Sequence, residues 1–157
     1  MIIGGILGSF GSMVYEKLTF KAYDWKEPPV IVNCYGEDFS ELYLIHGVNY
    51  WSQLGYKFSF IEHNPTPHMC KADYIQGFIL IKKKELKGDT LATTYRRVFM
   101  GKIVSAVIYF KPGTFKLTNV VEHELGHAIG FGHVEIDGHL MNPEFEKMSS
   151  KFWIPEK

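Results

Sequence analysis

Three histidines fall within the eleven residues from His123 to His133, and their spacing limits the fold more than any other feature of the sequence. Asn119 is a suitable N-cap and no helix breaker follows it, so we expect a helix from there through roughly Gly130. At about 3.6 residues per turn, His123 and His127 project from one face of this helix, one turn apart. Two imidazole nitrogens in that arrangement can bind the same zinc ion at about 2.0–2.1 Å.

A glycine, a third histidine and a glutamate complete this pattern. Gly130 can adopt a positive φ, end the helix and turn the chain back beneath the metal. His133 then supplies a third ligand from outside the helix, and the fourth tetrahedral position stays open to water, as in catalytic zinc sites. Glu124 follows the first ligand, so its carboxylate can lie beside the metal as a general base. The alternative is an ordinary helix with unrelated histidines, which explains neither the glycine nor the third histidine.

Residues 123–133 match the long zinc signature of the metzincin metalloproteases, His-Glu-x-x-His-x-x-Gly-x-x-His. Those enzymes also have a methionine in a tight turn below the metal. Residues 138–143, Gly-His-Leu-Met-Asn-Pro, resemble that turn, with Met141 as the floor residue. Leu-Met-x-Pro resembles the matrixin branch, whose members include the matrix metalloproteases and small prokaryotic and phage-encoded relatives. Met141 as simple core filler is the alternative, which the neighbouring Pro143 disfavours.

The resemblance implies an α+β fold, with a twisted mixed five-stranded sheet, an antiparallel edge strand and two main helices. It also implies a zinc-dependent endopeptidase that cleaves peptides or proteins and holds one catalytic Zn²⁺. The residues that it assigns to the site are the ligands His123, His127 and His133, the general base Glu124, and the structural residues Gly130 and Met141. Calcium is not expected, because residues 86–102 contain no aspartate–histidine cluster.

In the family fold the antiparallel edge strand lines the cleft and hydrogen-bonds an extended substrate as an added strand. Pro143 and the residues after it correspond to the outer wall of the pocket for the side chain that follows the cleaved bond. The resemblance therefore predicts substrate contacts at Leu91, Ala92, Thr93, Thr94, Tyr95, Asn142 and Pro143.

The rest of the chain alternates strand-like and helix-like runs. Strands are expected at residues 30–35, 56–61, 74–81, 91–99 and 103–110. The last two form a hairpin around Gly101, the first strand exposed at the sheet edge and the second central and apolar on both faces. A helix is expected from the N-cap Asp38, with Glu41 as its capping-box partner, to about Gly55. Its apolar stripe consists of Phe39, Leu42, Ile45, Val48 and Trp51.

The first 20 residues form an apolar, glycine-rich arm ahead of a core at residues 25–145, and we expect one catalytic domain over residues 1–157. Its first part, residues 1–14, lacks the basic region of a signal peptide and is too short to span a bilayer. A first strand, or an arm packed on the domain, is the simpler interpretation. An arm that docks into a neighbouring subunit is the alternative.

Charge and the remaining histidines and cysteines indicate little further function. Seventeen lysines and arginines balance 17 aspartates and glutamates, which gives no electrostatic basis for binding nucleic acid or an anionic membrane. Cys34 and Cys70 are expected near opposite ends of neighbouring strands and are not expected to pair. The histidines expected to be ordinary side chains rather than ligands are His46, His63, His68 and His139.

An alternative function is a structural or assembly subunit of a larger particle, such as a phage virion, that retains the zinc site. In that case the N-terminal arm contacts an assembly partner. A hydrolase of some other bond is a third interpretation. Glu124 and the open fourth ligand position favour catalysis over both. The sequence does not fix a compartment, and the cytoplasm or a virion is compatible with the absence of a signal peptide.

Overall fold

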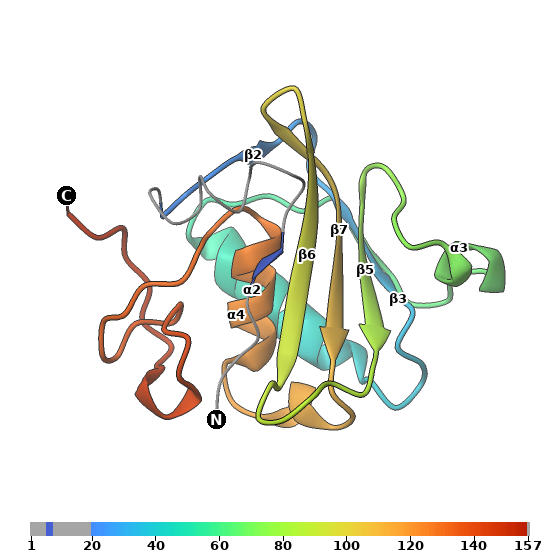
Figure 1. Ribbon diagram of the computed structural model, residues 1–157. Coiled ribbons are helices and arrows are strands. Elements are labelled where there is room, and N and C mark those ends of the chain that lie inside the picture. The colour runs from blue at the N-terminus through green and yellow to red at the C-terminus, as the bar shows by residue number, and fades with distance from the viewer. Residues whose placement is uncertain (1–5, 8–19, 157) are drawn as a thin grey trace.

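The computed structural model describes residues 6–7 and 20–156, which form a twisted sheet with helices packed against it (Figure 1). The strands are β1 (Ile6–Leu7), β2 (Asp24–Trp25), β3 (Val30–Asn33), β4 (Ile61–Glu62), β5 (Phe78–Lys83), β6 (Ala92–Phe99) and β7 (Lys102–Phe110). The helices are α2 (Glu41–Gln53), α3 (Pro67–Lys71) and α4 (Val120–Ala128), with 3₁₀ turns η1 (Thr114–Lys116) and η2 (Phe145–Lys147). Within these residues, no helix is both long and apolar enough to cross a bilayer.

The described strands form one seven-stranded sheet in the order β1-β6-β7-β5-β3-β4, with β2 paired to β7. The predicted hairpin is confirmed: β6 and β7 pair antiparallel. Met100 and Gly101 connect them with φ values of 49° and 76°, as a two-residue hairpin turn requires. The other strand pairs of this sheet are parallel.

The expected five-stranded sheet with an antiparallel edge strand is wrong in two respects. The sheet has seven strands, and the antiparallel strand β6 is not its edge, because β1 pairs with the outer side of β6 in parallel. Ile6 lies opposite Thr94, and Leu7 lies opposite Tyr95. Strands of two residues, such as β1 and β2, are too short to produce an alternating hydrophobic pattern. The rest of the N-terminal arm, apart from Phe20, lies outside the described residues, and so does the predicted docking contact.

The central strands bury side chains on both faces of the sheet. On one face Ile31, Ile79, Ile81, Ala106 and Ile108 join the core beneath α2 and α4. On the other face Val32, Leu80 and Val107 pack with residues that include Met69 of α3. The prediction that residues 103–110 are apolar on both faces is confirmed.

Helix α2 exists as predicted, but its start and its buried face differ from the sequence interpretation. The N-cap is Ser40 rather than Asp38, and its hydroxyl accepts from the Leu42 N–H at 3.3 Å. Leu42 is 69% exposed, whereas Leu44, Gly47 and Trp51 are buried. A Cβ on Gly47 would lie 2.7 Å from Cδ1 of Leu125, so α2 approaches α4 through a glycine. Glycine has no side chain and does not contribute to a hydrophobic pattern. The predicted apolar stripe of α2 is therefore rotated about the helix axis relative to the face that is buried.

The prediction that Cys34 and Cys70 stay unpaired is wrong, because the two form a disulfide with their Cα atoms 5.4 Å apart. Cys70 does not lie on a strand. It lies on α3, a one-turn helix that begins after the N-cap Thr66, whose hydroxyl accepts from the Met69 N–H at 3.4 Å. The sequence analysis expected no helix between the strands at residues 56–61 and 74–81 and so missed α3, which carries Cys70 to the end of β3.

Strand β6 is also more buried than an exposed edge strand. Thr93, Thr94 and Arg96 are 8%, 0% and 1% exposed. The side chains of Thr94 and Arg96 reach α4, and β1 pairs with the strand's outer side. The polar residues of β6 were predicted to face solvent, and two of them instead face the helix that carries the histidine pair.

Candidate metal centre

The imidazoles of His123, His127 and His133 point toward one another. The first two lie on α4, and His133 lies in the loop that follows. Nε2 of His133 is 3.2 Å from Nε2 of His123 and 3.0 Å from Nε2 of His127. Two nitrogens that bind one tetrahedral zinc ion at 2.0–2.1 Å lie about 3.3 Å apart. The three side chains therefore fit a zinc ion.

Main-chain carbonyls fix the tautomer of both histidines on α4. Nδ1 of His123 lies 2.6 Å from the Leu140 oxygen, and Nδ1 of His127 lies 2.9 Å from the Phe131 oxygen. A carbonyl only accepts, so each Nδ1 donates its proton and each Nε2 presents a lone pair. A proton on Nε2 of His133 can bond to only one of these lone pairs at a time. A cation satisfies all three nitrogens together.

Burial keeps these imidazoles uncharged in the metal-free protein. His123 and His127 are 0% exposed, and desolvation, followed by the neighbouring His133, lowers their pKa values well below the usual range. Burial lowers the pKa of His133 to about 4. All three side chains are therefore neutral at pH 7, and metal binding there needs no deprotonation of the ligands.

Helix α4 ends in a Schellman motif around Gly130. The N–H of Phe131 donates to the Gly126 oxygen, and the N–H of Gly130 donates to the His127 oxygen, both at 3.0 Å. The φ of Gly130 is +117°, which L side chains rarely adopt. The prediction that Gly130 ends the helix with a positive φ is confirmed. The turn sends the chain back toward the cluster, where His133 completes it.

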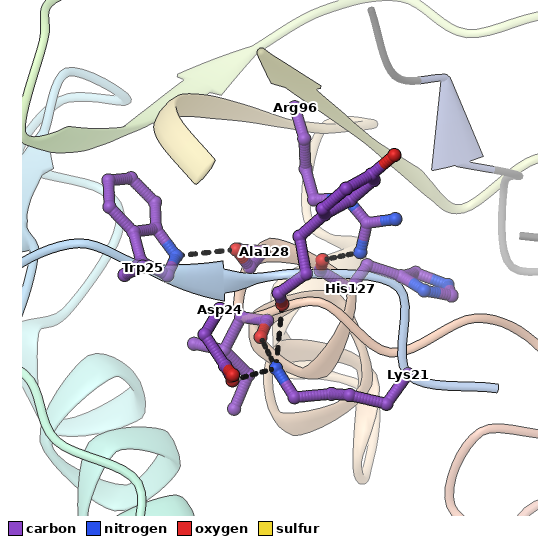
Figure 2. Close-up of polar contacts among 8 residues, drawn as sticks. Lys21, Asp24, Trp25, Arg96, His127 and Ala128 are labelled. Atoms are coloured by element: carbon purple, nitrogen blue, oxygen red, sulfur yellow. Dashed lines mark hydrogen bonds and ion pairs between the residues drawn. The ribbon is translucent and has the colours of Figure 1, made fainter. Parts of the chain in front are cut away.

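Three side chains from separate segments bind the last carbonyls of α4 (Figure 2). Nη1 of Arg96 donates to the His127 oxygen at 2.6 Å, and Nε1 of Trp25 donates to the Ala128 oxygen at 2.9 Å. Nζ of Lys21 donates to the Ile129 oxygen at 2.6 Å. The C-terminal end of a helix carries partial negative charge, so cationic donors are favourable there. The position of the helix end is therefore fixed by β6, by β2 and by the segment just before β2.

Close packing requires two glycines between His123 and His133, and one of them, Gly130, is also required by its positive φ. A Cβ on Gly130 would lie 2.1 Å from the Tyr23 oxygen, because residues 20–25 cross directly over the turn. A Cβ on Gly126 would lie 2.7 Å from Sδ of Met141 and 2.7 Å from Cζ2 of Trp51. Met141 is fully buried against this glycine of α4, and its role as the floor residue of the site stays a prediction.

His139 organises the methionine turn, a role that the sequence analysis did not assign to it. Its Nδ1 accepts from the Met141 N–H at 2.9 Å, so its Nε2 carries the proton and donates to the Trp153 oxygen at 2.8 Å. Burial lowers the pKa of His139, which favours this neutral form. The Leu140 carbonyl between these residues is the acceptor for His123. The turn therefore connects His139 to a histidine of the cluster.

Glu124 is fully buried, and Thr94 of β6 binds it. The Thr94 hydroxyl donates to Oε2 of Glu124 at 2.5 Å. Oε1 has no hydrogen-bond partner among the residues that the structure describes. Burial raises the pKa of Glu124 to about 8 in the metal-free protein, against the opposing effect of the Thr94 hydrogen bond. A divalent cation at the neighbouring nitrogens favours the ionised carboxylate.

The predicted substrate-binding residues lie in two places. Ala92–Tyr95 begin β6, and β1 pairs with Thr94 and Tyr95 on the outer side of that strand. Leu91 lies just before β6, and its carbonyl accepts from the Lys111 N–H and the Thr114 hydroxyl. Asn142 uses its side-chain amide within its own loop, because Nδ2 donates to the Ile136 oxygen at 3.0 Å and Oδ1 accepts from Glu144. Pro143 follows it, half-buried.

Sequence reasoning missed four residues that hold the centre in place, namely Thr94 as a partner of Glu124, Arg96, Gly126 and His139. Two of these had a signal: the polar residues at alternate positions 94 and 96 point to one face of a strand. A histidine two residues before the turn methionine could have suggested an Asx-like bond to the main chain. Nothing in the sequence indicates which helix β6 faces.

The model of the matrixin family, a metallopeptidase family, matches residues 35–157, which include α2, β5–β7, the three-histidine cluster and the methionine turn. No curated protein matches the chain. The family match covers most of the sequence, and the cluster fits the zinc site of the long histidine signature. This chain belongs to the matrixin family.

Proposed function

We propose that the protein is a zinc-dependent endopeptidase that hydrolyses internal peptide bonds of an extended polypeptide. The observation that carries the proposal is the convergence of three imidazoles, with Nε2 of His133 3.2 Å and 3.0 Å from Nε2 of His123 and His127, beside the buried carboxylate of Glu124. Family membership supports metallopeptidase chemistry and protein substrates. His123, His127 and His133 hold the metal through Nε2.

Bound zinc supplies a Lewis acid and an acidified water. In our proposal Glu124 is the general base. Its Oε1 takes the proton as the water attacks the scissile carbonyl carbon, and the same carboxyl then gives that proton to the departing amine nitrogen. Proton transfer requires an ionised carboxylate whose accepting oxygen has no competing partner. The absence of a described hydrogen bond to Oε1 agrees with that requirement.

The direct test uses a peptide library and the zinc-loaded protein, with cleavage sites mapped by mass spectrometry. We expect cleavage at internal bonds, loss of cleavage with a chelator, and recovery when zinc is restored. Glu124→Gln should keep bound zinc and lose about 10²–10⁴-fold in kcat. His127→Ala should lose both zinc and activity, because two imidazoles hold the ion poorly.

Full activity of Glu124→Gln would remove the assigned base. If the fully zinc-loaded protein cleaves no peptide, the endopeptidase proposal fails and the alternative of a structural subunit with a retained zinc site becomes the better account. No observation within residues 20–156 favours that alternative now, and we do not propose it.

A further inference from the structure

We propose that Thr94 is a positioning residue for Glu124: its hydroxyl holds Oε2 so that Oε1 faces the attacking water. The inference rests on the proposed peptidase function, because it assigns a role within that site. The hydrogen bonds of the Thr94 hydroxyl go to Glu124, and in our proposal Thr94 does not touch the reacting atoms and acts only through that glutamate.

The contact is short, buried and specific to one oxygen. Thr94 and Glu124 are both 0% exposed. The hydroxyl lies 2.5 Å from Oε2 and 3.3 Å from the main-chain oxygen of the same glutamate. A hydroxyl has one proton, and a hydrogen bond to a carboxylate is both shorter and stronger than one to a neutral oxygen. The Thr94 hydroxyl therefore donates its proton to Oε2 of Glu124 and not to the main-chain oxygen.

The strand and the helix fix the two side chains before any ligand binds. Thr94 and Arg96 lie at alternate positions of β6 and so point to the same face. Arg96 binds the main chain of α4 at His127, three residues beyond Glu124. β6 thus contacts α4 at two successive points, one on the backbone and one on the carboxylate. A glutamate side chain has three rotatable bonds, and the Thr94 contact restricts the last of them.

A purely structural role is the competing explanation. A buried carboxyl group needs a hydrogen-bond partner, and Thr94 could satisfy that need without any effect on the reaction. The two roles predict different kinetics. A structural role lowers stability or zinc content and leaves kcat per folded, zinc-loaded molecule unchanged. A positioning role lowers kcat in molecules that are folded and fully loaded, with little change in KM.

Three variants test the difference, each assayed with bound zinc quantified. Thr94→Val keeps the shape of the side chain and removes the hydroxyl, Thr94→Ser keeps the hydroxyl, and Thr118→Val is the matched control at an exposed threonine outside the site. We expect kcat of Thr94→Val to fall about 10- to 100-fold, with KM and zinc content within about twofold of the parent protein. Thr94→Ser and Thr118→Val should keep kcat within about threefold. If Thr94→Val does not fold, Thr94→Ala replaces it.

A crystal structure of zinc-loaded Thr94→Val provides a readout that does not depend on activity. We expect the Glu124 carboxylate to rotate or to occupy more than one orientation in that variant, and to keep the parent orientation in Thr94→Ser. An unchanged carboxylate in Thr94→Val, or an unchanged kcat, would overturn the inference. If the parent protein cleaves no peptide, the proposed function fails, and the crystallographic comparison alone then decides whether Thr94 positions Glu124.

Discussion

The two sides of helix α4 are built differently. Toward α2 the helix packs through apolar side chains, with Leu125 on Gly47 and Trp51 against Gly126. The hydrogen bonds on this side converge on one residue, Glu122, which binds Trp51 through its carbonyl and His46 through its carboxylate. Toward β6 and residues 20–25 the contacts are directional hydrogen bonds, from Thr94 to the Glu124 carboxylate and from Arg96 to a carbonyl at the helix end. Apolar packing sets how close the helix lies but tolerates rotation. Hydrogen bonds fix rotation and axial position, which a metal site needs to within a fraction of an ångström.

This difference predicts that changes on the α2 side act mainly on the free energy of unfolding. Changes on the β6 side should act on the geometry of the centre at a smaller cost in stability. The four experiments below test that division.

The largest expected effect is on the apolar side. Leu125→Ala removes a fully buried side chain and leaves a cavity between α4 and α2. Gly47, which lies opposite on α2, has no side chain that could move into this cavity. We expect the free energy of unfolding to fall by about 4 kcal/mol, measured by denaturant titration of the zinc-loaded protein. Leu42→Ala is the control, because Leu42 is 69% exposed, and it should change stability by less than about 0.5 kcal/mol. Similar losses in the two variants would contradict the assignment of the buried face.

The next largest effect is expected at the turn after α4. Gly130→Ala meets both an unfavourable φ and the Tyr23 oxygen, and we expect a loss of about 3 kcal/mol together with weaker zinc binding. Gly138→Ala is the control, since that residue also has positive φ, +84°, but nothing within 4 Å of its Cβ. It should cost about 1 kcal/mol. Equal costs would mean that conformation alone, without the crossing segment, explains the glycine of the motif.

Acid is expected to lower the free energy of unfolding of the metal-free protein through the buried histidine cluster. His133 has its folded pKa lowered to about 4, so between the unfolded pKa of about 6.5 and pH 4 the unfolded chain binds a proton that the folded chain does not. Stability therefore falls as the pH drops through this window, by about 2 kcal/mol. The raised pKa of Glu124 opposes this change. The experiment is best made on metal-free Glu124→Gln, in which that titration is absent. Stability that stays flat from pH 6.5 to 4 would contradict the burial of the cluster.

The smallest effect is expected from one helix-end donor. Trp25→Phe keeps the ring and removes the bond to the Ala128 oxygen, and we expect a loss of about 1 kcal/mol. The comparison predicts that this variant loses more zinc affinity, relative to its loss of stability, than Leu125→Ala does. Isothermal titration with zinc on the metal-free proteins measures that ratio. A larger relative loss of affinity in Leu125→Ala would reverse the roles of the two sides.

The features that the sequence predicted correctly depend on residues that are close together in the chain. The histidine cluster depends on spacing within one helix and one turn, so the helix after Asn119 and the positive φ of Gly130 were predicted correctly, although the Asn119 side chain makes no capping hydrogen bond. The β6–β7 hairpin is likewise local, with a two-residue connection at Met100 and Gly101. Local patterns are encoded in adjacent residues and need no knowledge of tertiary packing.

The N-cap of α2, Ser40 in place of Asp38, is a local failure, but most of the others involve partners that are far apart in the sequence. The pairing of Cys34 with Cys70 depends on a short helix within a proline-containing loop. The burial of Arg96 depends on α4, because its side chain binds the carbonyl of His127, 31 residues further along the chain. The buried face of α2 depends on Gly47, where close approach replaces a side chain. In each case tertiary contact outweighed a reasonable local preference.

The pairing of β1 with β6 has a kinetic consequence. The outer side of a strand offers one row of N–H and C=O groups, so it accepts a single partner at a time. A peptide that adds to β6 opposite Thr94 and Tyr95 must first displace Ile6 and Leu7. Ile6 and Leu7 belong to the same chain as β6, so they compete at an effective concentration that does not depend on how dilute the protein is. Turnover of such a peptide then depends on the rate at which the chain's own strand leaves, so that dilution of the protein does not relieve the competition.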